Sequence, residues 1–508
     1  MPTFTAPDGA VLAYRLLGRG EPLICLPGGP LRASAYLGDL GGLSRTRRLV
    51  LPDPRGTGGS AAPDDPSAYR CDRLVGDVEA LRVHLGLGHI DLLAHSAAAN
   101  LAVLYAARHP GRLRTLTLIT PGTRAAGLPV TGRELREAAA RSAGEPWYAE
   151  ARAALEEILA GRVTDAARSA VAPLTYGRWD ATARAHAAGA AAQTNTEAAS
   201  FHYAEGAFDP AATVAALGEL AAPVLVVAGE HDAGPRPDRA AQLAALFPHA
   251  ELAVQPGAGH YPWIDDPGTF ARTVEAFLDP AVSSVRAGGI RLAHRTWGDP
   301  SAPPLVLAHG RGGDSRDWAG VAARLGAHHR VYALDLRGHG LSDWPGRYSF
   351  ELFRDDLHGF LEARGLAGAT LIGHSAGGTA ALLLAQRHPG LVGRLVLEEP
   401  PPPVPLDPPR PPAERPPGTL GFDWPVVPAT DEWLNDPDPG IREHLDRITA
   451  PTLVIGGTRS HVDQEQLRSL AGRTPGGRYA PVDAGHLVHA DNPDGFLAAL
   501  ASFGIGRG

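Results

Sequence analysis

The stretch LIGHSAGGTAALLLAQ at residues 371–386 contains an apolar run, a turn of small residues around Ser375, and a second apolar run with helical spacing. Gly373 and Gly377, two positions before and after the serine, allow a tight strand-to-helix turn to close without steric clash. A serine at the tip of such a turn presents its hydroxyl above the end of a strand. The pattern therefore predicts a nucleophilic Ser375 on an α/β framework.

The same set of motifs occurs a second time, earlier in the chain and in the same order. AHSAA at 94–98 corresponds to GHSAG at 373–377, DPRGTGGS at 53–60 to DLRGHGLS at 335–342, RHPG at 108–111 to RHPG at 387–390, and AGH at 258–260 to AGH at 484–486. The offset between Ser96 and Ser375 is 279 residues (375 − 96). This order indicates a duplication into two domains, predicted at 1–279 and 286–508. The short linker leads us to expect that the two domains pack on each other.

In each half, apolar runs alternate with helical stretches, which predicts a mostly parallel sheet with helices on both faces. The two halves differ in one interval. Serine to late histidine spans 164 residues in the first half (260 − 96) and 111 in the second (486 − 375). The alanine-rich segment at about 122–217 predicts a helical cap. The segment at about 400–440 begins with a proline tract and predicts a short, extended flap.

Each serine needs a base, and His260 and His486 are the candidates because each follows Ala-Gly late in the chain. Asp232, just after an apolar strand, is expected to orient His260. In the second half Ser460 occupies the corresponding position. The second acid is then Glu399, at the end of the strand that follows the nucleophile helix, or alternatively Asp463, or that site is degenerate. In the first half Ala94 and Ala98 replace the two glycines, and Ser96 is still the predicted nucleophile.

Negative charge that develops on an attacked carbonyl oxygen requires backbone N–H donors already aimed at it. The residue after each serine, Ala97 or Ala376, supplies one donor. We expect the second from a glycine-rich loop after an early strand, at Gly29 in the first half and Arg311 in the second.

With these motifs identified, the chain resembles the α/β-hydrolase superfamily, once in each half. The first half is similar to the proline iminopeptidase branch, because PGGP at 27–30 stands where that group has its HGGPG loop, with Pro27 in place of the histidine. The resemblance implies a small-molecule or short-peptide substrate. It also implies a role in substrate-amine recognition for Glu197, assisted by Glu205.

The predicted reaction is hydrolysis of an ester or amide through an acyl-enzyme, without a cofactor or metal. An acyltransferase, a lyase or cyclase that uses the same oxyanion site, and a domain retained only for binding or docking are open alternatives. The net charge of −8, without clustered arginines, argues against a nucleic-acid partner. No apolar run approaches the length of a membrane helix, and no leader is evident, so we expect a cytoplasmic protein without membrane contact.

Overall fold

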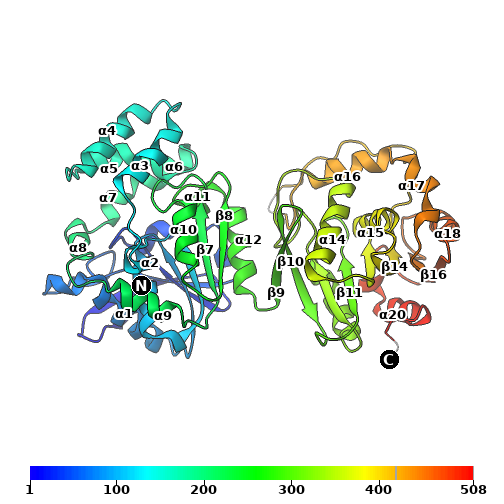
Figure 1. Cartoon of the computed structure of the whole chain (residues 1–508), viewed down its shortest axis with the longest axis horizontal. Coiled ribbons are helices and arrows are strands. Elements are labelled where there is room, and N and C mark those ends of the chain that lie inside the picture. Colours follow the sequence, from blue (N-terminus) through cyan, green and yellow to red (C-terminus); the bar gives the residue numbers. More distant parts are fainter. Residues whose placement is uncertain (418–419, 507–508) are drawn as a thin grey trace. The chain divides into compact units, whose positions relative to one another are not determined.

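The computed structural model describes residues 1–417 and 420–506. The chain divides into two compact units, Met1–Leu278 and Asp279–Gly508 (Figure 1). The second unit begins earlier than the sequence suggested. Part of the expected linker forms strand β9 (Val282–Ala287), which pairs antiparallel with β10 (Ile290–Trp297).

The first domain contains one eight-stranded sheet in the order β1-β2-β4-β3-β5-β6-β7-β8. The strands not yet introduced are β1 (Thr3–Thr5), β2 (Val11–Leu17), β3 (Pro22–Leu26), β4 (Arg48–Pro52), β5 (Ile90–His95), β6 (Leu113–Ile119), β7 (Val224–Gly229) and β8 (Ala250–Gln255). Strand β2 pairs antiparallel with both β1 and β4, and the other pairings are parallel. The carboxyl ends of β5, β6 and β7 therefore meet at one edge of the sheet.

The second domain has the same topology, with the sheet order β9-β10-β12-β11-β13-β14-β15-β16. Its further strands are β11 (Pro304–Ala308), β12 (Arg330–Leu334), β13 (Ala369–His374), β14 (Val392–Glu398), β15 (Thr452–Gly457) and β16 (Arg478–Val482). The predicted fold of two doubly wound α/β domains is confirmed.

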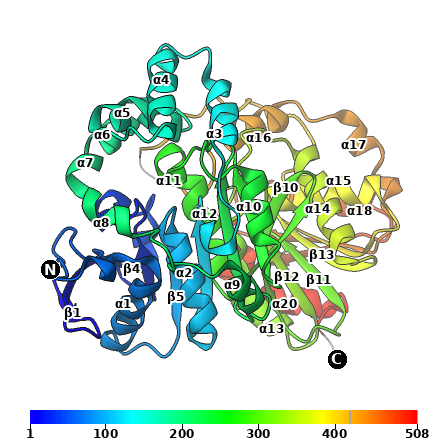
Figure 2. The ribbon, with the colours of Figure 1, turned by 60° about the vertical axis from the view of Figure 1, so that its left-hand side comes forward.

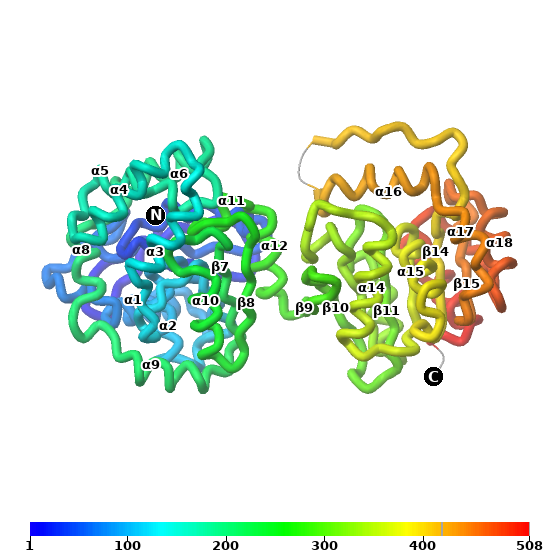
Figure 3. The backbone as a smooth tube through the Cα atoms, turned by 45° about the horizontal axis from the view of Figure 1, so that its top comes forward, coloured from blue at the N-terminus to red at the C-terminus, as the bar shows by residue number. Residues whose placement is uncertain are grey.

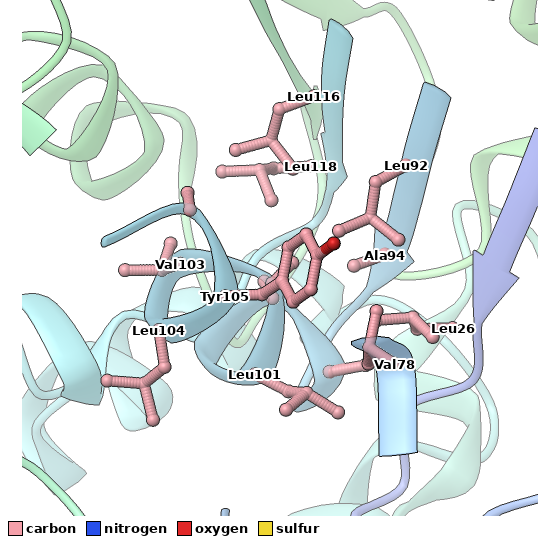
Figure 4. Packing of buried hydrophobic residues seen from close by; sticks show 14 of the residues in the cluster. Leu26, Val78, Leu92, Ala94, Leu101, Val103, Leu104, Tyr105, Leu116 and Leu118 are labelled. Carbon is pink, nitrogen blue, oxygen red and sulfur yellow. The ribbon is translucent and has the colours of Figure 1, made fainter. Parts of the chain in front are cut away.

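Alternation along the central strands divides the core into two faces, because neighbouring side chains of a strand point in opposite directions. Leu92 of β5 belongs to a buried cluster that includes residues of α1, α2 and α10, while the adjacent Leu93 belongs to a second cluster that includes residues of α12. Figure 4 shows Tyr105 of α2 beside the strand residues Leu92 and Leu118, and Leu101 of the same helix near Val78. The helices that flank the two sheets are α1 (Cys71–His84), α2 (Ala98–Arg108), α10 (Pro237–Ala244), α11 (Pro262–Asp265) and α12 (Pro267–Leu278), then α13 (Ala319–Leu325), α14 (Phe350–Arg364), α15 (Ala376–Arg387), α18 (Gln464–Arg473), α19 (Val488–Asp491) and α20 (Pro493–Ser502).

Helices fill the interval between β6 and β7, where the sequence predicts a cap. They are α3 (Gly132–Ala139), α4 (Tyr148–Leu159), α5 (Asp165–Val171), α6 (Ala181–Ala188), α7 (Ala190–Gln193), α8 (Thr196–Phe201) and α9 (Pro210–Leu217). Thr131 begins α3 with a capping box to Glu134, and Asp180 caps α6, so the sequence specifies these helix starts locally. In Figure 2, α7 and α8 lead down from the upper cap helices to the sheet.

The proline-rich interval of the second domain is only partly extended. Residues 400–417 contain no helix or strand, as expected for prolines without N–H donors, but α16 (Val426–Asn435) and α17 (Pro439–Glu443) follow. The expectation of an extended flap over 400–440 therefore holds only for its first part. Helix α16 forms because Pro428 lies in the first turn, where its missing N–H is not needed, and because Val426, Val427 and Leu434 are buried. Residues 418–419 lie outside the described part of the chain.

The extended segment is attached to α16, and both run along the same side of the second domain in Figure 3. The backbone N–H of Arg410 donates to Asn435 (2.7 Å), Asn435 donates back to the Arg410 carbonyl (3.0 Å), and the Arg410 guanidinium pairs with Asp431 (2.8 Å). A stiff proline segment and a helix thus form one short cap in place of the helical cap of the first domain.

Candidate active sites

Both serines occupy strained turns between a strand and a helix. Ser96 follows β5 with φ of 53°, and Ser375 follows β13 with φ of 47°. Non-glycine residues rarely adopt this region, and it persists only where the surrounding structure imposes it. The serine hydroxyls are therefore held above the carboxyl ends of the central strands in both domains.

In the first domain a continuous hydrogen-bond chain joins serine, histidine and aspartate. His260 Nε2 lies 2.8 Å from Ser96 Oγ, and His260 Nδ1 lies 2.8 Å from Asp232 Oδ2. Asp232 is buried, and its other oxygen accepts from the Gly234 N–H at 2.8 Å. This arrangement fixes the histidine so that Nε2 can take the serine proton while the carboxylate stabilises the resulting imidazolium.

In the second domain the acid is hydrogen-bonded to the histidine, but the serine is not. Glu399 Oε2 lies 3.1 Å from His486 Nδ1, whereas the described residues contain no hydrogen bond between Ser375 Oγ and His486. The ring of His461 packs beside His486, with centroids 4.6 Å apart. Asp463, the alternative acid, is exposed and caps α18 by accepting from the Glu465 and Gln466 N–H groups.

Glu399 is held by several donors at the sheet edge. It accepts from the Gly457 N–H (2.6 Å), from Gln464 Nε2 (3.2 Å) and from the hydroxyl of Ser460. Burial pushes the pKa of Glu399 upward, but the hydrogen bonds from His486, Ser460, Gly457 and Gln464 together lower the pKa below its ordinary value. Glu399 is therefore ionised at neutral pH.

The residue after the fourth parallel strand differs between the domains. Thr120 and Glu399 follow β6 and β14, and both have positive φ, 40° and 50°. Thr120 Oγ1 donates to the His260 carbonyl (3.0 Å), whereas Glu399 reaches the His486 ring itself. After the next strands, β7 and β15, the two types of side chain are exchanged. The first domain has the carboxylate, Asp232, and the second has the hydroxyl, Ser460.

The expected oxyanion loops lie directly against both serine turns. A Cβ placed on Gly28 would come 2.9 Å from Ser96 Cβ, and one on Gly310 would come 3.2 Å from Ser375 Cβ. Gly29, with φ of 122°, and Arg311 are the next residues along these loops. Their N–H groups, with those of Ala97 and Ala376, are the donors that the sequence singles out.

The two loops are anchored differently. In the second domain the Leu336 N–H donates to His309 Nε2 (2.9 Å), so the ring proton is on Nδ1, which donates to the Gly310 carbonyl (2.7 Å). In the first domain the Gly28 N–H donates to the Tyr36 hydroxyl (2.7 Å), which in turn donates to His95 Nδ1 (2.7 Å). No motif surrounds Tyr36, so sequence reasoning missed it.

The residue before each serine is a histidine whose ring is hydrogen-bonded to the backbone carbonyl of the late histidine. His95 Nε2 donates to the His260 carbonyl (3.0 Å), and His374 Nε2 donates to the His486 carbonyl (3.0 Å). Burial lowers the pKa of His374 to about 4 and that of His95 well below its ordinary value, so both rings are neutral. Tyr36 and His95 together link the oxyanion loop to the backbone of His260.

An arginine attaches each loop to its cap. Arg32 donates through Nε (3.0 Å) and Nη2 (2.7 Å) to Gln193 at the end of α7. The guanidinium of Arg311 pairs with Asp431 on α16 (2.7 Å) and donates to Thr430 (3.0 Å). A cap movement in either domain would therefore reach the oxyanion loop.

Glu197 and Glu205 are exposed, on α8 and just after it. The Glu205 carbonyl accepts from Arg70 (3.1 Å). Neither carboxylate lies in a dry pocket. Across residues 1–417 and 420–506, no cluster of three or more His, Cys, Asp or Glu side chains is placed to hold a metal, and no helix is long and apolar enough to cross a membrane.

The model of the alpha/beta hydrolase fold family matches residues 21–267 and 303–424 of this chain. The chain belongs to the alpha/beta hydrolase fold family. Both matches contain a serine turn and its oxyanion loop.

Several relatives with assigned activities are hydrolases. The chain is 30% identical over 259 residues to N-formylmaleamate deformylase of Pseudomonas putida, covering 44% of this chain and 96% of that protein. It is 28% identical over 253 residues to an sn-1-specific diacylglycerol lipase of Mus musculus, covering 41% of this chain and 82% of the lipase. An uncharacterised protein of Mycobacterium tuberculosis is 37% identical over 127 residues, 25% of this chain, and the chain spans only 37% of that protein's length. Among solved structures, the enol-lactonase of Burkholderia xenovorans LB400 is similar, with 25% identity, a TM-score of 0.38, and coverage of 44% of this chain and 99% of the lactonase.

Proposed function

We propose that the chain carries two serine hydrolase sites, each of which cleaves an ester or amide bond through an acyl-enzyme. In the first domain Ser96 is the nucleophile, His260 the general base and Asp232 the acid that orients it. In the second, Ser375, His486 and Glu399 have these roles. The observation that carries the proposal is the unbroken hydrogen-bond chain from Ser96 Oγ through His260 to Asp232.

The proposed steps follow from this geometry. His260 Nε2 takes the proton of Ser96 as its oxygen attacks the substrate carbonyl, and the N–H groups of Ala97 and Gly29 stabilise the oxyanion. His260 then gives the proton to the leaving group. Water, activated by the same histidine, hydrolyses the acyl-enzyme.

Hydrolysis of p-nitrophenyl esters by wild type, Ser96→Ala, Ser375→Ala and the double variant tests the proposal. Each single variant should keep the activity of the other site, and the double variant should lose about 10⁴-fold or more. Unchanged hydrolysis in the double variant would rule out serine nucleophiles and favour another reaction on this fold. Activity that disappears fully with Ser96→Ala would mean that the second domain only binds or docks.

The proline iminopeptidase-like activity of the first domain is a finer proposal, and it depends on Glu197 or Glu205 pairing with a substrate amine. Both are exposed, and a solvated carboxylate contributes little to binding a cation. Amino-acid anilides in the same assay test it. Anilide turnover that requires a free amine and falls in Glu197→Gln would support it.

A further inference from the structure

A small cavity of about 50 Å³ lies beside the serine turn of the first domain. Ala97 and Ala98, the two residues after the nucleophile, form part of its wall. The remaining wall is mostly apolar and comes from β1 to β4, α1, α2, the loops after β3 and β4, and the residue after α8. It consists of Phe4, Leu12, Leu26, Pro27, Pro30, Leu31, Pro52, Asp53, Pro54, Leu74, Asp77, Val78, Leu81, Leu101 and His202. Three of these residues, Leu26, Val78 and Leu101, are drawn in Figure 4.

The second domain has hydrogen bonds at the corresponding positions. The Leu336 N–H donates to the ring of His309, and the Gly377 N–H donates to the His309 carbonyl (3.1 Å). A Cβ on Gly377 would come 2.4 Å from the Ala308 carbonyl oxygen, so loop and helix touch there.

In the first domain all three of these positions are changed together. Pro27 replaces the histidine, Pro54 replaces the residue whose N–H holds it, and Ala98 replaces the glycine. Proline at 54 has no N–H to donate, so the link is absent from this domain. Pro27, Pro54 and Ala98 all line the cavity, which means that the exchange exposes apolar surface beside the oxyanion donor of Ala97.

Two carboxylates border the cavity, but both already have hydrogen-bond partners within the protein. Asp53 accepts from Ser34 and from the Gly59 N–H, and Asp77 pairs with Arg55 through two hydrogen bonds of 2.6 and 2.7 Å. They do not offer a binding group to a ligand.

His202 is different, because it is only 2% exposed and neither ring nitrogen has a hydrogen-bond partner among the described residues. The main chain of Ala97 lies near the ring without meeting hydrogen-bond geometry. Burial lowers the pKa of His202 to about 4, so the ring is neutral and carries one donor and one acceptor. A buried polar group without a partner requires an explanation in a native protein, and a ligand group that supplies the partner is one such explanation.

We propose that this cavity binds the acyl group of the first domain's substrate, and that the acyl group is a short apolar chain carrying a hydroxyl that pairs with His202. A hydroxyl both donates and accepts, so it matches whichever ring nitrogen faces the cavity. The inference rests on Ser96 being the nucleophile, because Ala97 and Ala98, the residues that follow it, line the cavity.

The first test varies chain length in a Ser375→Ala background, where only the first site turns over. The value of kcat/KM for p-nitrophenyl acetate, butyrate and hexanoate should rise by about fourfold per methylene that enters the cavity. Val78→Phe fills the cavity and should abolish this rise. Val75→Phe, on the same helix but outside the cavity wall, is the matched control for overpacking and should leave the chain-length profile as in the parent. A profile that is flat in the parent, or equally altered by both variants, would overturn the cavity assignment.

The second test addresses His202 with p-nitrophenyl hexanoate and its hydroxyhexanoate analogues. The parent should prefer the best-placed hydroxy ester, and His202→Phe should reduce that preference about tenfold, mainly by improving plain hexanoate relative to the hydroxy ester. His202→Gln, which retains a donor and an acceptor, should keep most of the preference. No preference in the parent, or the same loss in both variants, would contradict the hydroxyl assignment.

A small fluorophosphonate separates failure of this inference from failure of the proposed function, because it does not need the cavity. If Ser96 is labelled but the variants keep the chain-length and hydroxyl preferences of the parent, the assignment of the cavity is rejected and the proposed nucleophile is retained. Absence of labelling would reject the nucleophile itself.

Discussion

The two domains place a carboxylate and a hydroxyl at the same two neighbouring strand ends, in opposite order. The first domain has Thr120 after β6 and Asp232 after β7, and the second has Glu399 after β14 and Ser460 after β15. In the first the hydroxyl supports the histidine backbone and the acid holds the ring. In the second the acid holds the ring and the hydroxyl donates to the acid.

On the proposed mechanism, this exchange indicates what a serine site on this sheet requires. The histidine needs a buried carboxylate at Nδ1, and either of two adjacent strand ends can supply it, because parallel strands bring their carboxyl ends to one edge. The side chain from the more distant position must be longer. Glutamate, with one more methylene than aspartate, has the necessary reach.

The largest effect on kcat should come from replacing Glu399, the acid that follows β14 in the second domain. Glu399→Gln keeps the size of the side chain but cannot stabilise an imidazolium, so kcat of the second site should fall by about 10⁴-fold in a Ser96→Ala background. The measurement is ester hydrolysis. Asp463→Asn is the matched control and should leave kcat unchanged, because Asp463 only caps α18. Equal losses in both variants would contradict the assignment of the acid.

A second test moves the carboxylate of the second domain from the end of β14 to the end of β15. Glu399→Thr with Ser460→Asp recreates the first-domain arrangement, and should recover most of the activity that Glu399→Thr alone loses. Failure of the double variant, with folding intact by circular dichroism, would mean that the two strand ends are not interchangeable.

The next effect concerns the anchoring of the oxyanion loop. Tyr36→Phe leaves the Gly28 N–H and His95 Nδ1 without their shared partner, and should lower kcat of the first site about 10- to 100-fold while KM changes little. Steady-state kinetics in the Ser375→Ala background measure it. Tyr69→Phe, at a tyrosine outside this hydrogen-bond chain, is the comparison. A change in KM alone would show that Tyr36 shapes substrate binding rather than the loop.

Smaller differences are expected at the serine turns. Gly377→Ala should destabilise the second domain by about 1–3 kcal/mol, because the added methyl would meet the Ala308 carbonyl. Ala98→Gly should cost the first domain only about 1 kcal/mol, through helix propensity and a slightly larger cavity. Urea unfolding of the variants measures both. Equal costs would indicate that the two turns are equally tight.

The smallest effect is a pH dependence of stability. The folded-state pKa of Glu399 lies below its ordinary value of about 4.3, so its contribution is fully present above that pH and is lost as pH falls through the folded-state pKa. Ser460→Ala removes one hydrogen bond that lowers this pKa. Between about pH 6 and about pH 3 the melting temperature of the variant should therefore fall by less than that of wild type, because the folded-state pKa of Glu399 in the variant lies closer to its unfolded-state pKa. Superimposable profiles would argue against the hydroxyl as a partner of the acid.

Much of this arrangement can be predicted from the sequence, for identifiable reasons. The serine turns, the late histidines and Glu399 lie at strand ends that local patterns mark, and the parallel sheet brings such ends together. Helix α16 was not predicted, because the proline tract before it dominated that interval. Tyr36 and His202 carry no local signal, since their roles depend on contacts between residues far apart in the chain.

Intact mass after labelling with a fluorophosphonate tests most directly whether two serines are activated. Wild type should gain two adducts, with Ser96 reacting faster because its hydrogen bond to His260 is already formed. Ser96→Ala and Ser375→Ala should each gain one, and the double variant none. An unlabelled Ser375→Ala protein, in which Ser96 is intact, would contradict the account.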